Sequence, residues 1–349
     1  MKGIGTILKQ WMLPVAMVTG ALSYIIYDMM PASVHAAGPF LNGLVAVLQP
    51  LMIFAMLFLT FIRIEPKDLK PHRWHWWLLL IQGGLFTLLS MLAYWAMERF
   101  PDNSAGWVVL LESAMLCFIT PTATAAAVVT RKLNGDVPGI TTYIVLINIL
   151  TALLVPLMLP LICPFADTDF WTSFGLIMSK VFPLLIAPCL CAWLVRYMFP
   201  QLYRRLLQYP DLAFYIWGLA LTLAIAVTVK SIMQSDMAPG LLLAMSAVSL
   251  VCCIFQFAAG RLVGSRYVPR SRVPLDSKAV LRGREVRKVT AGQSLGQKNT
   301  IFSIWLAYTF MTPETAIIGG LYSIWHNLYN SWQLYRAGKK QDPLPLRYQ

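Results

Sequence analysis

Ten stretches of mostly apolar residues account for most of this chain of 349 residues. A helix needs about 20 such residues to cross the hydrocarbon core of a bilayer. Overall, 58% of the residues are hydrophobic and 12% are charged, whereas soluble domains carry roughly 25% charged residues. The sequence therefore predicts an all-α polytopic membrane protein. We expect helices over residues 10–28, 39–62, 74–97, 106–130, 138–162, 173–196, 210–230, 239–260, 289–311 and 313–335.

Lysine and arginine are concentrated in alternate connections between these stretches. The two termini and every second connection together hold 24 basic residues, and the remaining connections hold two. The positive-inside rule places the basic connections in the cytoplasm. We therefore expect ten transmembrane helices in the plasma (inner) membrane, with both termini cytoplasmic. This distribution explains the net charge of +13 without a nucleic-acid partner.

The richest connection, residues 261–288, carries nine basic residues together with prolines and a glycine. It shows no apolar periodicity, so we predict a solvated basic cytoplasmic loop. Anionic lipid headgroups are its expected partners, because clustered bases next to a membrane are attracted to them.

Two of the apolar stretches contain residues that are costly in lipid. The first is Thr120–Thr124 (Thr-Pro-Thr-Ala-Thr), and the second is Gly292–Asn299 (Gly-Gln-Ser-Leu-Gly-Gln-Lys-Asn). Proline cannot donate to the helical hydrogen-bond ladder. Unwound backbone at membrane depth is tolerated only where protein or water covers it. We therefore predict that both stretches break their helices.

The two breaks lie at corresponding places, in the fourth and the ninth span. The ten spans divide into residues 1–165 and 166–349, and an odd number of spans in each half inverts the second half relative to the first. Interrupted spans at matching positions of inverted repeats point to the binding site of many secondary transporters. We predict two inverted five-helix repeats whose broken helices cross near the middle of the membrane.

The polar residues of the breaks are the candidate binding residues. Lys298 lies roughly 15 Å along a helix from Lys288, which is too deep for snorkelling to bring its ammonium to the surface. The threonines of the first break either line a site or bond back to carbonyls of their own helix. Gln82 in the third span either binds a ligand or joins two helices. The candidate set is Thr120, Pro121, Thr122, Thr124, Gln82, Gln293, Ser294, Gln297, Lys298 and Asn299, with Glu112, Asn148, Lys180, His326 and Asn327 as weaker candidates.

Three stretches resemble the bile acid:sodium symporter family. They are Cys117–Thr124, Gly292–Asn299 leading into Trp305-Leu-Ala, and Tyr322–Asn327 (Tyr-Ser-Ile-Trp-His-Asn); Gln82 also falls where such carriers place a glutamine. The resemblance implies a core domain of spans three to five and eight to ten, which holds the crossed helices. It also implies a panel domain of spans one, two, six and seven that moves against the core. In that family the substrate binds between core and panel, and sodium ions bind behind the crossing.

The second break departs from the family at the sodium site. Where the family has an acidic residue, this chain has Gln293 or Ser294, and Lys298 replaces the glutamine before Asn299. The first break likewise has Ala123-Thr124 in place of a Gly-Gly-containing break that ends in Ser-Asn. An ammonium brings one positive charge and three donors, so we expect Lys298 to take the place of one sodium ion. No resident metal or cofactor is expected. The coupling ion is sodium or a proton, since burial favours the neutral form of a lysine.

The two breaks together with the resemblance imply a secondary active transporter that moves a small organic anion, bile-acid-like or another carboxylate, by alternating access. Half-helix N-termini favour anions. The alternatives are a sodium-coupled symporter like the family at large, and a passive channel or sensor without coupling. We do not expect an enzyme, because the sequence lacks HExxH, GxSxG and paired intramembrane aspartates. It also lacks a P-loop, so ATP is not the predicted energy source.

Overall fold

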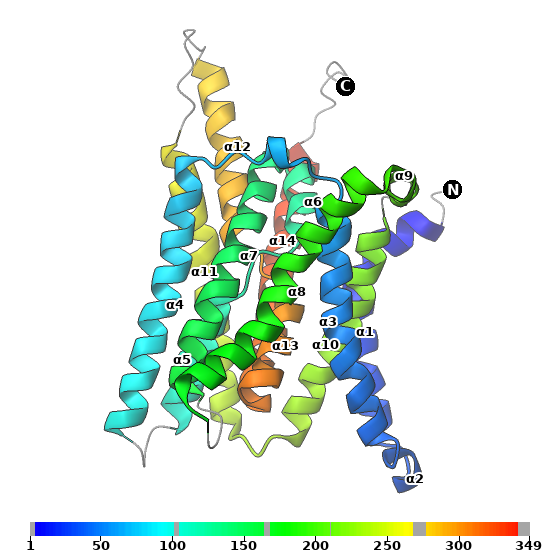
Figure 1. Ribbon diagram of the computed structural model, residues 1–349, viewed down its shortest axis with the longest axis vertical. Helices are drawn as coiled ribbons and strands as arrows, with labels where there is room; N and C mark the ends of the chain where they lie inside the picture. Colours follow the sequence, from blue (N-terminus) through cyan, green and yellow to red (C-terminus); the bar gives the residue numbers. More distant parts are fainter. Residues whose placement is uncertain (1–3, 101–104, 164–167, 210, 268–276, 341–349) are drawn as a thin grey trace.

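The chain folds into a bundle of helices in the computed structural model, which describes residues 4–100, 105–163, 168–209, 211–267 and 277–340 (Figure 1). Most helices run along the long axis of the bundle. Helix α1 begins and helix α14 ends at the same end, which we call the terminal end; α2 lies at the opposite end (Figure 1).

Most of the apolar stretches become long helices. The first half of the chain contains α1 (Ile4–Asp28), α2 (Ala32–His35), α3 (Gly38–Phe61), the 3-10 turn η1 (Pro66–Asp68), α4 (Arg73–Arg99), α5 (Ala105–Ile119), α6 (Ala125–Lys132) and α7 (Val137–Ile162). The second half contains α8 (Phe170–Met198), α9 (Pro200–Leu207), α10 (Leu212–Gln234), α11 (Pro239–Arg266), α12 (Ser277–Gly296), α13 (Thr300–Phe310) and α14 (Pro313–Lys340).

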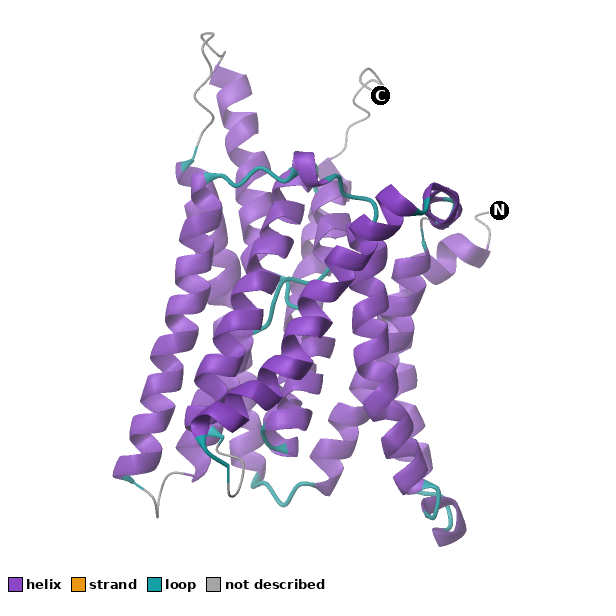
Figure 2. Ribbon diagram, in the orientation of Figure 1, coloured by secondary structure: helices purple, strands orange, loops and turns teal. Residues whose placement is uncertain are grey.

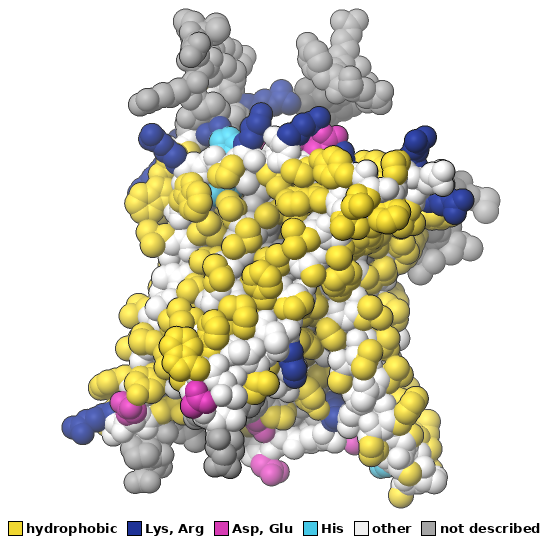
Figure 3. Space-filling model, in the orientation of Figure 1, with side chains coloured by type: hydrophobic (Ala, Val, Ile, Leu, Met, Phe, Trp, Pro, Cys, Tyr) yellow, Lys and Arg dark blue, Asp and Glu magenta, His cyan; other side chains and the backbone are white. Residues whose placement is uncertain are grey.

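Six of these helices, α3, α4, α7, α8, α10 and α11, are long and apolar enough to cross a membrane. Residues 106–119 and α13 form shorter apolar helices. The surface in Figure 3 is largely hydrophobic along the middle of the bundle, and lysine and arginine gather at the terminal end. These features confirm an all-α polytopic membrane protein.

The helix contacts fall into two groups. In one group α10 packs against both α1 and α3, and α3 packs against α8. In the other, α4 packs on α5 and α7, and α11 packs on α5, α12 and α14. The groups touch where α10 meets α13 and α14, and where α8 follows α7.

Helices α11 and α12 approach each other closely because α11 carries a Gly-x-x-x-Gly pattern on the shared face. A Cβ atom at Gly260 would lie 2.4 Å from the carbonyl oxygen of Ala291, and one at Gly264 would lie 2.4 Å from that of Arg287. Small residues at such positions let two membrane helices bring their backbones together.

The second break is shorter than predicted. Residues 292–296 are helical, because α12 continues to Gly296 and only residues 297–299 are unwound. The glycines serve packing here: a Cβ at Gly296 would lie 2.4 Å from the ring of Phe257, and one at Gly292 would lie 2.7 Å from the Arg261 side chain.

The prediction of a basic loop over residues 261–288 is also wrong for most of its length. Helix α11 extends to Arg266 and α12 begins at Ser277, and residues 268–276 lie outside the described part of the chain. Arg287 donates a hydrogen bond to the carbonyl of Tyr267, and Lys288 pairs with Glu285 at 2.5 Å. The two helices thus pack together beyond their apolar lengths, which a search for apolar periodicity could not detect.

Candidate functional site

The two helix breaks meet in the interior of the bundle. The first lies between the end of α5 at Ile119 and the start of α6 at Ala125. Thr122 and Lys298 form an isolated antiparallel bridge between the breaks. Around it, the Ala123 amide donates to the Gln297 carbonyl at 3.0 Å, and the Asn299 amide donates to the Pro121 carbonyl at 2.8 Å. In Figure 2 the unwound segments appear as loops at mid-height, surrounded by helices. The breaks therefore satisfy each other's backbone groups.

Side chains from three other helices satisfy the carbonyls freed at the end of α5. The Gln256 amide of α11 donates to the Cys117 carbonyl at 3.1 Å. The Thr151 hydroxyl of α7 donates to the Ile119 carbonyl at 3.0 Å. Each carbonyl at a helix end buried away from water needs such a partner.

Gln82 on α4 is the third side chain of this kind, and we call the side chains that support the crossing its shell. Its amide donates to the Thr120 carbonyl at 3.1 Å, and its carbonyl oxygen accepts from the Tyr143 hydroxyl at 2.9 Å. The predicted glutamine therefore supports the backbone of the first break. The Thr120 hydroxyl donates back to the Leu116 carbonyl of its own helix at 2.5 Å. This is one of the two alternatives that we predicted for the threonines of the first break.

The second break is held in a similar way. The Thr122 hydroxyl donates to the Ser294 carbonyl at 2.5 Å, and the Tyr322 hydroxyl of α14 donates to the Gly296 carbonyl at 2.8 Å. The Asn299 side chain accepts from the Phe302 amide at 3.3 Å and caps α13. Helices α6 and α13 both begin at the crossing, so their N-termini, which favour negative charge, lie there together.

Lys298 is only 1% exposed. Its ammonium donates to the Phe118 carbonyl at 3.4 Å, a long contact with the same freed helix end. Among the described residues the ion pairs are Lys67–Glu65, Arg196–Glu65 and Lys288–Glu285, so no carboxylate pairs with Lys298 there. A buried ammonium without an anionic partner is costly, so this lysine is a strong candidate for a functional group.

A small cavity lies beside the crossing, toward the terminal end. Its volume is about 10 Å³, close to the space of a single water molecule. Gln297, Lys298 and Asn299 line one side, and Trp217 and Leu221 of α10 close the other. His326 and Asn327, two of the weaker candidates, also line it.

A second cavity, of about 1200 Å³, lies between the two helix groups toward the opposite end of the bundle. Binding pockets for small molecules are typically about 300–1,000 Å³. The ends of α1 and α10, the start of α3 and the outer turns of α13 contribute to its wall. Lys180, a weaker candidate, lines it, and its ammonium lies 5.5 Å from the centre of the Phe310 ring.

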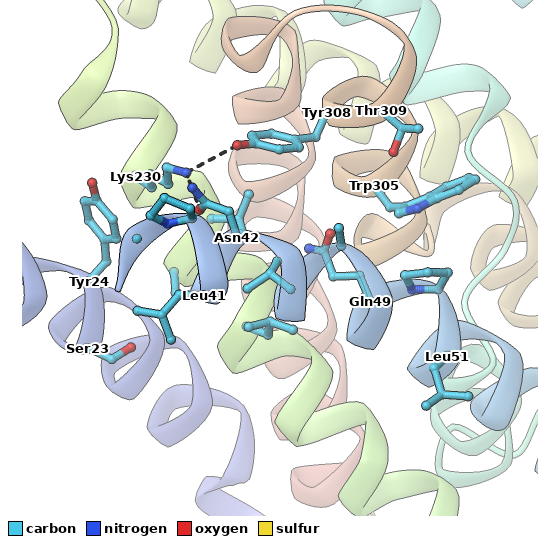
Figure 4. A pocket seen from close by; sticks show the side chains of 18 of the residues that line it. Ser23, Tyr24, Leu41, Asn42, Gln49, Leu51, Lys230, Trp305, Tyr308 and Thr309 are labelled. Carbon is cyan, nitrogen blue, oxygen red and sulfur yellow. Dashed lines mark hydrogen bonds between the residues drawn. The ribbon is translucent and has the colours of Figure 1, made fainter. Parts of the chain in front are cut away.

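Lys230 of α10 lines this large cavity (Figure 4). Its ammonium donates to the Asn42 side-chain oxygen at 2.7 Å and to the Tyr308 hydroxyl at 3.3 Å. Further along α3, the Gln49 side chain reaches the same cavity beside Trp305.

The candidate residues thus divide by location. Residues of the two breaks meet at the crossing, with Thr124 at the start of α6. Gln293 does not join them, because its amide donates to the Asn330 side chain of α14 at 2.9 Å. None of the ten main candidates lines the large cavity.

Two of the weaker candidates lie elsewhere. Glu112 accepts a hydrogen bond from Thr315 at 2.9 Å, away from both cavities, and Asn148 is buried in α7.

Sequence reasoning missed two groups of residues. Thr151 and Gln256 support the crossing. The sequence signal that could have identified them is a polar residue inside an apolar span. Asn42, Gln49 and Lys230 line the large cavity. Their signal is weaker, because residues 42 and 230 lie at predicted span ends, where polar residues are common.

One comparison with known proteins identifies a related family. The sequence profile of the Sodium Bile acid symporter family matches residues 50–235, which include the first break and Gln82. A search of curated proteins finds no match.

Proposed function

Because the chain belongs to the Sodium Bile acid symporter family, we propose that it is a secondary active transporter of a small organic anion. The family assignment makes the protein a membrane transporter of the symporter type. The proposal adds the cargo, the coupling and the alternating-access mechanism.

The observation that carries this proposal is the unequal space on the two sides of the crossing. A cavity of about 1200 Å³ lies on one side, and a cavity of about 10 Å³ lies on the other. Alternating access requires a site that is accessible from one side at a time. In our proposal the large cavity faces outward, because the terminal end carries most of the basic residues and these favour the cytoplasm.

The two helix groups are the proposed moving parts. Helices α4–α7 and α11–α14 form the core domain around the crossing, and α1, α3, α8 and α10 form the panel domain. This assignment makes each half of the chain five spans, in inverted orientation. The large cavity lies between the groups, with α13 on one wall and α1, α3, α8 and α10 on the other.

In this mechanism Lys298 takes the place of one bound sodium ion. Its ammonium supplies a positive charge behind the crossing and contacts a freed backbone carbonyl, a kind of oxygen that a sodium ion would bind. The half-helix N-termini and this charge favour an anion nearby. Proton release and rebinding by the lysine would couple transport to a proton gradient.

The second candidate function is sodium-coupled symport. The family match favours it, and so do two oxygens in or beside the second break. The Gln297 side-chain oxygen and the Ser294 hydroxyl are buried and have no hydrogen-bond partner among the described residues. Buried polar atoms of this kind are usually satisfied, and a cation binding there would satisfy them.

Counterflow in proteoliposomes tests the proposed function. Vesicles preloaded with unlabelled cholate should accumulate labelled cholate faster than empty vesicles, because a carrier exchanges substrate across the membrane. A panel of other organic acids covers a carrier with a different cargo. Flux of these anions without stimulation from the opposite side would instead indicate a channel. No flux of any tested anion would contradict the transporter proposal.

A further inference from the structure

We propose that Lys230, Asn42 and Tyr308 form the site that recognises the charged head of the transported anion. This inference rests on the proposed transport function and adds a specific ligand orientation to it. Figure 4 shows the Lys230 ammonium between the side chains of the other two residues, at the edge of the large cavity.

The contacts of Lys230 leave its charge available. An ammonium has three donors and no acceptor, and both of its partners, Asn42 at 2.7 Å and Tyr308 at 3.3 Å, are neutral. Within the described part of the chain no carboxylate lies within ion-pair distance of it. The Asn42 amide and the Tyr308 hydroxyl also carry donors of their own. A carboxylate or sulfonate could therefore accept hydrogen bonds from all three side chains.

The charge of the cavity wall favours the same ligand. Lys180, Lys230, Asp28 and His35 line the cavity. Two lysines against one aspartate leave the wall positive. Both lysines make a cation–π contact: the Lys180 ammonium lies 5.5 Å from the centre of the Phe310 ring, and the Lys230 ammonium lies 5.8 Å from the centre of the Tyr308 ring. Lys230 differs from Lys180 because it also donates hydrogen bonds to Asn42 and Tyr308, whose side chains carry donors that an anion can use.

In this proposal Gln49 recognises the other end of the ligand. This residue is 3% exposed, lines the cavity, and its amide nitrogen has no hydrogen-bond partner among the described residues. Asn42 and Gln49 lie seven residues apart on α3, or roughly 10 Å along the helix. Val45 and Phe54 add apolar wall on the same helix. The expected ligand is an elongated amphipathic monoanion, with its anionic head at Lys230 and an acceptor oxygen at Gln49.

The head site also joins the two moving parts. Lys230 lies on α10 and Asn42 on α3, whereas Tyr308 lies on α13, the half helix that begins at the crossing. The Lys230–Tyr308 hydrogen bond is therefore a contact between panel and core. An anion bound to Lys230 competes for this contact and links ligand binding to the position of α13.

The test measures charge selectivity in nanodiscs with purified full-length protein. Labelled cholate is displaced by unlabelled cholate or by its uncharged primary amide, for the parent and for Lys230→Met, Lys230→Arg and Lys180→Met. The parent should prefer cholate by at least about tenfold, as expected for a charge-assisted hydrogen bond. Lys230→Met should lose most of this preference, and Lys230→Arg should restore part of it. Lys180→Met, which removes the same charge from the same cavity, should change it much less.

Equal charge selectivity in the parent and in Lys230→Met would overturn the inference, and so would a larger loss in Lys180→Met. Counterflow with the same variants separates this result from the proposed function. Carrier activity that persists with unchanged selectivity in Lys230→Met rejects only the head site. A parent protein without counterflow rejects transport itself.

A second measurement tests the orientation. Gln49→Leu should reduce the preference for cholate over unhydroxylated cholanoate, while its preference for cholate over the amide should remain. Loss of charge selectivity in Gln49→Leu, with hydroxyl selectivity retained, would reverse the proposed orientation.

Discussion

Thr122 and Lys298 pair as an antiparallel bridge in the interior of the bundle, 176 residues apart in the chain. Each lies in the unwound part of a helix that continues on both sides. A lone bridge is a weak structural element, and this one is held by a shell of side chains from α4, α7, α11 and α14. The protein thus holds a non-helical crossing at membrane depth by surrounding it with donors from four helices.

Replacing Lys298 should alter coupling rather than folding alone. We expect uptake of cholate, or of the anion found by counterflow, to proceed equally in sodium and in choline buffer for the parent. Lys298→Gln should lose most of the uptake and its response to pH, because the variant lacks the charge and the exchangeable proton. Lys288→Gln, ten residues earlier and on the surface of α12, is the matched control and should behave like the parent.

Strong sodium dependence of the parent would contradict the replacement of a sodium ion by Lys298 and favour sodium symport. Full activity and an unchanged pH response in Lys298→Gln would exclude the lysine from the coupling mechanism.

Gly260→Ala should destabilise the protein, because the new Cβ would lie 2.4 Å from the Ala291 carbonyl oxygen and the backbone of α12 cannot move aside freely. Overpacking of this kind costs about 1–3 kcal/mol. Gly240→Ala in the same helix meets nothing within 4 Å and should be neutral or stabilising by up to about 1 kcal/mol. The apparent Tm in detergent measures both. An equal Tm for the two variants would show that α11 and α12 are not in backbone contact.

Gln82→Leu should weaken the shell around the crossing, because it leaves the Thr120 carbonyl and the Tyr143 hydroxyl without their partner. The expected loss of stability is about 1–2 kcal/mol. Tyr143→Phe removes only one of the two hydrogen bonds and should cost less. Thermal unfolding followed by a thiol-reactive dye compares the two. A larger loss for Tyr143→Phe than for Gln82→Leu would contradict the supporting role of the glutamine.

Single cysteines should report the predicted orientation in the membrane. On a background without native cysteines, a cysteine at Gly283 in α12 should react only from the cytoplasm. One at Ala36, after α2, should react only from outside, because the basic residues gather at the terminal end. A membrane-impermeant maleimide applied to intact cells and to inverted vesicles measures this. Labelling of both sites from the same side would refute the topology.

The sequence by itself determined most of the helical spans and the places where two of them break. Span length follows from local apolar runs, and Pro121 and Lys298 are incompatible with a continuous lipid-facing helix, so neighbours are not needed to predict them. The extent of the second break was decided by tertiary structure. Gly296 is the last residue of α12, and Phe257 of α11 packs against it; nothing in the local sequence specifies that contact.

The large cavity was likewise decided only by tertiary structure. Asn42 and Lys230 are 188 residues apart, and each is a single polar residue near a span end. Which side of a membrane helix faces lipid and which faces a cavity is not encoded by apolar periodicity, because both sides are largely apolar. The packing of α3, α10 and α13 around a shared space brings Lys230 to Tyr308, and the proposed binding site consists of residues that share no motif.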